Sequence, residues 1–303
     1  MISVFHLVRM ENGLEPLRRF VETYVRHPAG VDHRLVVIFK GFPSDQATLE
    51  YRHVLDQAAE FDAVHVTDDV LDVSAYARSV RQAAVDSSIV CFLNSYSRVL
   101  GDNWLKFLTD PITETDIGIV GATGSWASHR SYAFHMLGLS TPYRTALPSR
   151  IEFRQVADSI SAAAAPSRIR SLAKSLISLP GEVFCYGAFP APHVRTNAFA
   201  MRTTDFIAFS SDSIRRKSAA YRFEAGTRGL TACVLASGRR AVVVDVFGCR
   251  HDIVDWPNSN TFWQSRQQGL LIADNQTDSY SNASATARAA LAALAWGVRG
   301  KST

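Results

Sequence analysis

The sequence predicts an α/β protein whose core is a mostly parallel, Rossmann-like sheet flanked by helices, with a helical region appended to it. Three observations predict this class. Runs of β-branched and aromatic residues alternate with helical patterns from the first residues onward. The run Ser88–Leu93 is almost entirely apolar, as expected for a central strand buried on both faces. With 303 residues, the chain is long enough for one large domain or two closely packed lobes.

The order of the elements follows the hydrophobic periodicity. The first strand is predicted at Ile2–Val8 and the helix after it at Leu14–Val25, where apolar side chains recur on one face. Ser44 or Asp45 follows a turn and is expected to cap the next helix, which extends to about Phe61. The remaining predicted strands are Arg34–Phe39, Ala63–Val66, Ser88–Leu93, Ile117–Val120, His193–Arg202 and Arg240–Val246. The remaining predicted helices are Asp72–Ala84, Asp102–Leu108, Ile160–Ala165, Arg168–Ile177, Arg222–Ala236 and Thr286–Val298.

The regular alternation of strands and helices stops near residue 125. We therefore expect a first half over residues 1–125 and a second half over residues 126–303, which together form one domain. Residues 126–190 are less regular and are predicted to be an insertion or lobe. The helices expected near the C-terminus complete the second half.

Composition and charge are those of a globular protein. Hydrophobic residues make up 47% and charged residues 20% of the chain, which excludes a disordered or fibrous class. The net charge is only +4 and the basic residues are scattered, so no nucleic-acid partner is expected. The first strand follows Met1 without a signal peptide, and no apolar stretch is long enough to span a membrane. The four cysteines lack C-x-x-C spacing, which argues against a zinc cluster. A cytoplasmic protein is predicted.

The C-terminal region contains two features with open interpretations. The polar run Asp274–Thr277 is predicted to be a turn. The helix expected at Thr286–Val298 has an Ala/Leu face with Arg288 and Trp296 beside it. In one interpretation, this face packs against the domain or a second subunit. In the other interpretation, the helix lies on the membrane surface, and the protein is peripheral to the inner face of the membrane. The oligomeric state stays open.

Ligands of open parallel sheets bind beyond the carboxyl ends of the strands, so the segments directly after the strands are the candidate site. These segments contain neither G-x-G-x-x-G nor G-x-x-x-x-G-K-[ST], which argues against a dinucleotide oxidoreductase and a P-loop NTPase. No G-x-S-x-G is present, and Cys91 lies within an apolar strand. Serine and cysteine hydrolases are therefore disfavoured as well.

Four segments have counterparts in one known group of enzymes. They are Phe5–Asn12, Asp72–Ala84, Cys91–Leu105 and Arg222–Gly226. In these segments the chain resembles the GT-A glycosyltransferases, specifically the family-two group with its bacterial surface-polysaccharide members. The resemblance covers about residues 1–125, and residues 193–250 more weakly. It implies a GT-A-like, nucleotide-binding sheet, with the second half on the acceptor side.

The resemblance also implies a site for a nucleotide-sugar donor. The first strand and its loop resemble the part of the family that contacts the base and ribose, and the segment after Leu93 resembles its acidic motif. Asp72 is interpretable either as a base or ribose contact or as a helix cap. The residues implied in donor binding are Val8, Arg9, Glu11, Lys40, Asp72, Asn94, Ser95, Tyr96, Ser97 and Arg195.

One motif departs from the family's pattern. The Asp-x-Asp carboxylates that hold a divalent ion are replaced by Asn94-Ser95-Tyr96-Ser97. Hard cations such as Mn²⁺ and Mg²⁺ prefer carboxylate oxygens, and neutral groups offset none of their charge. No metal ligand is assigned, and the use of a metal stays open. Without a metal, basic side chains have to supply the positive charge next to the diphosphate. Arg9 and Arg195 are the favoured candidates for this role. Their alternative role is that of solvated surface arginines.

Glu224 lies where the family keeps an acidic catalytic-base motif. As general base it would take the proton from an acceptor hydroxyl that attacks the anomeric carbon opposite the diphosphate, which inverts the configuration. The alternative is a carboxylate in the first turn of a helix, stabilised by the helix dipole.

Polar and aromatic residues in the second half suit recognition of an acceptor sugar. The candidates are Trp126, His129, His251 and Trp256. The alternative for the first two is an ordinary loop, and for His251 a structural role, because no second histidine lies at ligand spacing.

The function predicted from these residues is transfer of a sugar from a nucleotide-sugar donor to a glycan or lipid-linked acceptor, with inversion. The alternative is a non-catalytic GT-A-like protein that binds a glycan or a partner protein, because loss of Asp-x-Asp is also what inactivation produces. A third interpretation is a nucleotidyltransferase that uses the same sheet. Fold alone does not separate them.

Overall fold

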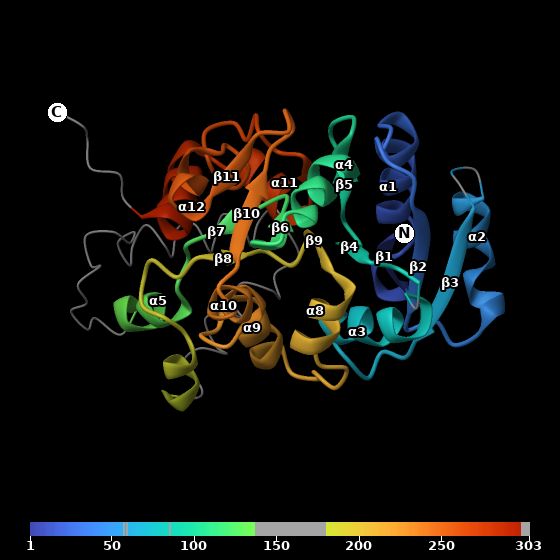
Figure 1. Ribbon diagram of the computed structural model, residues 1–303, viewed down its shortest axis with the longest axis horizontal. Coiled ribbons are helices and arrows are strands. Elements are labelled where there is room, and N and C mark those ends of the chain that lie inside the picture. The colour runs from blue at the N-terminus through green and yellow to red at the C-terminus, as the bar shows by residue number, and fades with distance from the viewer. Residues whose placement is uncertain (57, 59, 85, 137–179, 298–303) are drawn as a thin grey trace.

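The computed structural model describes the chain except for residues 57, 59, 85, 137–179 and 298–303. The helices predicted at Ile160–Ala165 and Arg168–Ile177 therefore lie outside the described residues. The main sheet consists of β1 (Ile2–Arg9), β2 (Arg34–Lys40), β3 (Phe61–Val66), β4 (Ile89–Leu93), β6 (Ile117–Gly121), β9 (Ala198–Arg202), β10 (Arg240–Val244) and β11 (Arg250–Asp252). These strands lie in the order β3-β2-β1-β4-β9-β6-β10-β11 (Figure 1).

Most neighbours in this sheet are parallel. The strands β1 to β4 pair in parallel, as do β6 and β10, whereas β9 runs antiparallel between β4 and β6. The predicted α/β class with a mostly parallel sheet is confirmed. The chain order reverses at β1, because β2 lies on one side of it and β4 on the other. The carboxyl ends of β1 and β4 thus form the switch point at which such sheets bind ligands.

Helices cover both faces of the sheet. They are α1 (Glu15–Arg26), α2 (Leu49–Leu55), α3 (Asp72–Ala83), α4 (Trp104–Thr109), α5 (His129–Met136), α8 (Thr203–Phe209), α9 (Lys217–Ala225), α10 (Leu230–Ala236), α11 (Asn275–Ser281) and α12 (Ala285–Trp296). Side chains alternate between the faces of β1, so that Phe5 and Leu7 pack with α3, and Val4 and Val8 pack with α1. The helices α3, α8 and α10 lie on one face and α1 and α4 on the other (Figure 1).

The elements predicted before residue 125 are confirmed with one exception. The helix expected to reach Phe61 is a 3₁₀ turn at Asp45–Thr48 followed by α2, which ends at Leu55. Ser44 precedes this turn but makes no side-chain capping bond. Phe61 begins β3 instead. The sequence pattern did not separate the two possibilities, because an aromatic residue fits a strand as well as a helix.

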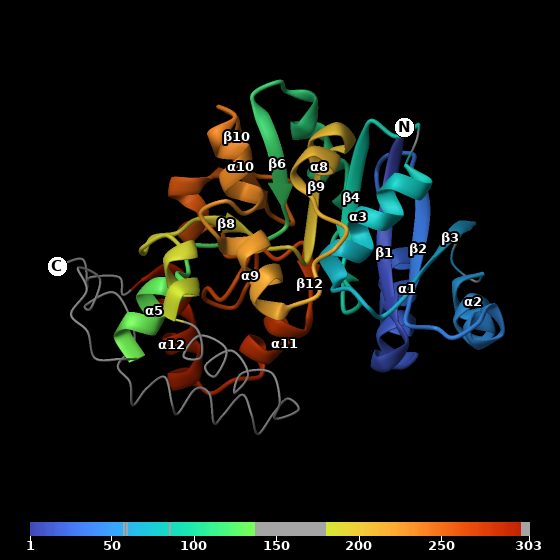
Figure 2. The same ribbon diagram turned by 90° about the horizontal axis from the view of Figure 1, so that it is seen from below.

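Two elements predicted in the second half are each divided in the structure. The strand expected at His193–Arg202 consists of β8 (His193–Val194) and β9, with residues 195–197 between them. While β9 joins the main sheet, β8 pairs with β7 (Gly124–Ser125). The helix expected at Arg222–Ala236 is divided into α9 and α10, which Figure 2 shows as separate helices beside β8.

Gly226 ends α9 at a position where a side chain does not fit. A Cβ atom there would lie 2.4 Å from the Arg222 main-chain oxygen. We expect Gly226→Ala to lower the free energy of unfolding by about 1–3 kcal/mol, because the backbone has to shift. Gly187→Ala is the matched control, since its Cβ atom would lie 3.8 Å from Ala191 Cβ, at ordinary contact distance. Equal urea midpoints for the two variants would contradict this prediction.

The polar run before α11 is a helix start rather than a turn. The Asp274 side chain accepts hydrogen bonds from Gln276 N at 3.0 Å and Thr277 N at 2.9 Å. Thr277 Oγ1 in turn accepts from Asp274 N at 2.8 Å. This reciprocal pair is a capping box with threonine in the place of the usual glutamate, so the predicted turn is wrong.

The last helix, α12, packs its apolar residues against the domain. Leu291 and Ala295 are buried, and Trp296 Nε1 donates to Phe262 O at 2.7 Å. This contact agrees with the interpretation in which the helix packs against the domain. Across the described part of the chain, none of the helices combines the length and the apolar character that a membrane crossing requires.

Candidate active site

The candidate site lies at the carboxyl ends of β1, β2 and β4, next to the 195–197 segment, which consists of Arg195, Thr196 and Asn197. Because β9 is antiparallel, its first residue Ala198 pairs with Leu93, the last residue of β4. The 195–197 segment therefore reaches the same edge of the sheet as the loops after β1 and β4. A main-chain hydrogen bond of 2.9 Å from Asn94 N to Asn197 O joins two of these loops.

Two cations are the last residues of β1 and β2, and their carboxylate partners lie in segments that follow strands. Arg9 contacts Glu11 at 2.7 Å, Asp72 at 3.5 Å and Asp68 at 3.7 Å. Lys40 is only 1% exposed and contacts Asp68 and, at 3.8 Å, Asp72. The hydrogen bond from Lys40 lowers the pKa of Asp68 despite the opposing effect of burial, and Arg9 lowers it further. The structure thus brings together four predicted residues, with their charges already balanced.

The predicted motif after β4 forms a turn closed by its own hydrogen bonds. Asn94 Oδ1 accepts from Tyr96 N at 3.0 Å and from Ser97 Oγ at 3.1 Å. The Tyr96 hydroxyl donates to Asn12 Oδ1 at 3.0 Å, which links this turn to the loop after β1. Ser95 and Ser97 are both buried. Val8 also has a buried side chain, which packs in the core and is not available to a ligand.

The residues after β4 do not fit a divalent cation. The turn contains no carboxylate, and Asn94 Oδ1 already accepts two hydrogen bonds. Within the described residues, no group of three His, Cys, Asp or Glu side chains is arranged to hold a metal ion. Mn²⁺ and Mg²⁺ prefer carboxylate oxygens, and this turn offers them none.

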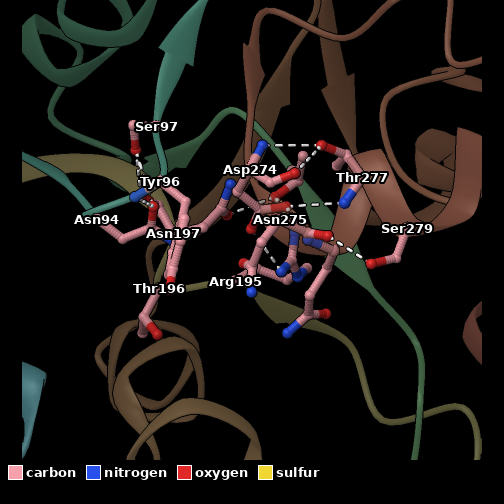
Figure 3. A network of polar contacts seen from close by, with 12 residues as sticks. Asn94, Tyr96, Ser97, Arg195, Thr196, Asn197, Asp274, Asn275, Thr277 and Ser279 are labelled. Carbon is pink, nitrogen blue, oxygen red and sulfur yellow. Dashed lines mark hydrogen bonds and ion pairs between the residues drawn. The ribbon is translucent and has the colours of Figure 1, made fainter. Parts of the chain in front are cut away.

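Arg195 is part of a buried ion pair. Its Nη2 lies 2.9 Å from Asp274 Oδ2, and the two side chains are 6% and 1% exposed. Its guanidinium also lies 4.0 Å from the ring centroid of Phe262. Figure 3 shows this pair beside Thr196 and Asn197. Because Asp274 already neutralises it, Arg195 is not a free cation for a diphosphate, contrary to the expectation above.

Glu224 lies in the last turn of α9 and its side chain contacts the 195–197 segment. Its Oε2 accepts hydrogen bonds from Thr196 N at 2.8 Å and from Thr196 Oγ1. Among the described residues, none hydrogen-bonds to Oε1. The alternative role, a carboxylate in the first turn of a helix, is wrong. Glu224 is instead at the carboxyl end of α9, where the dipole disfavours negative charge.

Two histidines lie within electrostatic range of Glu224. His129 begins α5 and stacks on Tyr186 and Tyr221, with ring centroids 4.7 and 5.4 Å apart. Burial and the neighbouring His193 lower the pKa of His129 to about 4, against the opposing effect of Glu224. Burial also lowers the pKa of His193, and Glu224 opposes this shift too. Both imidazoles are therefore neutral near pH 7 and able to hydrogen-bond a hydroxyl without carrying charge.

The other predicted acceptor residues have partners within the domain. Trp256 is 0% exposed and packs against Gly124, where an added Cβ atom would lie 2.6 Å from its ring. It therefore presents no face to an acceptor, which corrects the prediction. Trp126 stacks edge-on against another tryptophan, with centroids 6.1 Å apart, and is partly buried. His251 Nε2 contacts Asp245 Oδ2 at 2.9 Å. His129, in contrast, lies in electrostatic range of Glu224.

Four residues of this site were missed by the sequence pattern. They are Asp68, His193, Thr196 and Asn197. The signal for the last two is the polar run Arg195–Asn197 inside an otherwise apolar strand, which marks an interruption. Asp68 lies in a segment after β3 that was a candidate by position, but nothing in the sequence favoured it over Asp72.

No protein-family model matches the chain, and no curated protein matches it. Solved structures do match. A mannosyltransferase from Pyrobaculum calidifontis in complex with GDP-Man and Mn²⁺ is 9% identical, with a TM-score of 0.43 over 79% of this chain and 53% of that one. A mannosyltransferase from S. cerevisiae is 9% identical, with a TM-score of 0.41 over 79% and 68%.

A further match is core-mannan synthase A from Aspergillus fumigatus in its Mn/GDP form. It is 8% identical, with a TM-score of 0.39 over 78% of this chain and 68% of that one. This chain spans about half the length of the Pyrobaculum structure.

Proposed function

We propose that the protein is a glycosyltransferase that moves a sugar from a nucleotide-sugar donor to a hydroxyl of a glycan or lipid-linked acceptor. The observation that carries this proposal is Glu224, a carboxylate at the edge of the sheet where ligands bind. It lies at the carboxyl end of α9 against the helix dipole, and one of its oxygens is free of partners among the described residues. A carboxylate kept at an unfavourable position supports a functional role.

The proposed reaction is an inverting displacement. Glu224 takes the proton of the acceptor hydroxyl while the hydroxyl oxygen forms a bond to the anomeric carbon. The bond between that carbon and the diphosphate oxygen breaks, and the nucleoside diphosphate leaves with the electron pair. Neutral His129 and His193 hydrogen-bond the acceptor near Glu224 without neutralising its charge.

Arg9 and Lys40 are the proposed partners of the leaving diphosphate. They are the last residues of β1 and β2, and the carboxylates Asp68 and Asp72 now balance their charge. Phosphate oxygens would replace these carboxylates in part, and each contact would be a charge-assisted hydrogen bond. This arrangement supplies positive charge where the family's metal would supply it.

Thermal unfolding with UDP-, GDP-, dTDP- and CMP-linked sugars tests the proposal. A donor present at about 100 times its Kd stabilises the native state by about 2.7 kcal/mol, so the correct donor raises the midpoint. Wild-type protein that shows neither a shift nor donor turnover with any of these sugars would contradict the proposed function.

We also expect transfer to be independent of a metal, because the turn at Asn94–Ser97 offers no carboxylate to a cation. Donor turnover should be the same, within about twofold, in EDTA and in excess Mn²⁺ or Mg²⁺. The measurement is release of nucleoside diphosphate. Loss of turnover in EDTA that Mn²⁺ restores would show that this expectation is wrong.

A second candidate is a non-catalytic protein that binds a glycan through the same fold. The observation that favours it is the charge balance around Arg9 and Lys40: both side chains are already paired with carboxylates, so neither is an unpaired cation for a diphosphate. The donor experiment separates the two functions. Binding of a glycan without binding or turnover of any donor would support this second candidate.

A further inference from the structure

We propose that Thr196 is the positioning residue that orients Glu224, an inference that rests on the proposed function. Thr196 donates twice to one carboxylate oxygen. Its main-chain N lies 2.8 Å from Glu224 Oε2, and its Oγ1 contacts the same atom. The carboxylate is thus fixed through one oxygen, while Oε1 stays available for the proton of an acceptor hydroxyl.

Glu224 needs such a partner because its own helix does not orient it. The residue lies in the last turn of α9, and Gly226 directly beyond the helix already has an extended backbone. A glutamate side chain has several rotatable bonds, and ordering it costs conformational entropy. The carboxyl end of a helix also repels a carboxylate. Two hydrogen bonds from Thr196 offset both effects and hold the oxygen in one place.

Thr196 is itself held between two residues with fixed partners. On one side, Arg195 N donates to Thr123 O at 3.1 Å, and the Arg195 side chain pairs with Asp274 at 2.9 Å. On the other side, Asn197 Oδ1 accepts from Thr123 Oγ1 at 2.7 Å. These contacts fix the 195–197 segment to the edge of the sheet and to α11. The position of Thr196, and through it that of the Glu224 carboxylate, is therefore set by the sheet.

Substitution at position 196 separates positioning from a general structural role. Thr196→Val keeps the shape and the main-chain N–H but removes the hydroxyl donor. We expect kcat to fall about ten- to a hundredfold, with KM for donor and acceptor changed less than about threefold. Thr196→Ser restores the hydroxyl and should keep kcat within about threefold of the wild type. Equal activities of the valine and serine variants would overturn the proposal.

The same substitution in the Glu224→Gln background gives a second readout. If Thr196 acts through Glu224, valine should have no further effect on the residual rate of that variant. An equal loss in both backgrounds would overturn the positioning role. Thr196→Ala, which also lacks the hydroxyl, gives the same comparison if the valine variant does not fold. A wild type without any donor turnover contradicts the proposed function, whereas an active wild type matched by Thr196→Val contradicts only the role of Thr196.

Discussion

Replacing Glu224 with glutamine is expected to lower kcat for sugar transfer by about a hundred- to ten-thousandfold. The amide keeps the size of the side chain, and its oxygen still accepts from Thr196, but it does not take up a proton. KM for the donor should change little, because the proposed donor contacts are at Arg9 and Lys40. The measurement is steady-state kinetics of nucleoside diphosphate release with the acceptor present.

The matched control for this prediction is Glu22→Gln. Glu22 is an exposed glutamate near the end of α1, where it pairs with Arg26 at 2.6 Å. It lies outside the candidate site, so its substitution should leave kcat unchanged. A Glu224→Gln variant as active as Glu22→Gln would remove Glu224 as the general base.

Substitution of Asp274 by alanine is expected to lower the free energy of unfolding by about 3–5 kcal/mol. The change leaves the buried guanidinium of Arg195 without its carboxylate partner. It also removes the cap of α11, because Asp274 accepts from the N–H groups of Gln276 and Thr277. Urea unfolding followed by circular dichroism measures this loss.

Two further variants show whether the buried charge is the cause. Glu22→Ala breaks an exposed ion pair and should cost less than about 1 kcal/mol. The double variant Arg195→Met/Asp274→Leu leaves no unpaired charge and should be more stable than Asp274→Ala alone. If Asp274→Ala is as mild as Glu22→Ala, the ion pair does not contribute in the expected way.

The first half of the fold was predictable because its pattern is local. The strands β1, β2 and β4 are largely apolar runs, and the helix α1 between the first two shows one apolar face. The divided elements of the second half were not predictable in this way. The apolar residues on both sides of Arg195 fit one continuous strand, and the interruption results from tertiary contacts with Asp274 and Glu224.

The site was predictable in composition but not in geometry. Arg9 and Lys40 end their strands, Asp72 begins α3, and the three side chains do lie together. The sequence did not reveal that Arg195 is paired with Asp274, because the two residues are distant along the chain. Nor did it reveal that Trp256 is buried, because an aromatic residue after a strand suits a binding surface and a core equally well.

The position of β9 between β4 and β6 has a consequence for folding. Both strands belong to the first half of the chain, yet Leu93 pairs with Ala198 and Gly121 pairs with Phe199. Until β9 is added, each of these buried strands has an edge of unpaired N–H and C=O groups. Formation of the sheet therefore depends on contacts between distant parts of the chain, which slows folding and makes it cooperative. We therefore expect the two halves to fold as one unit, and the site at the sheet edge to form only when β9 has joined β4 and β6.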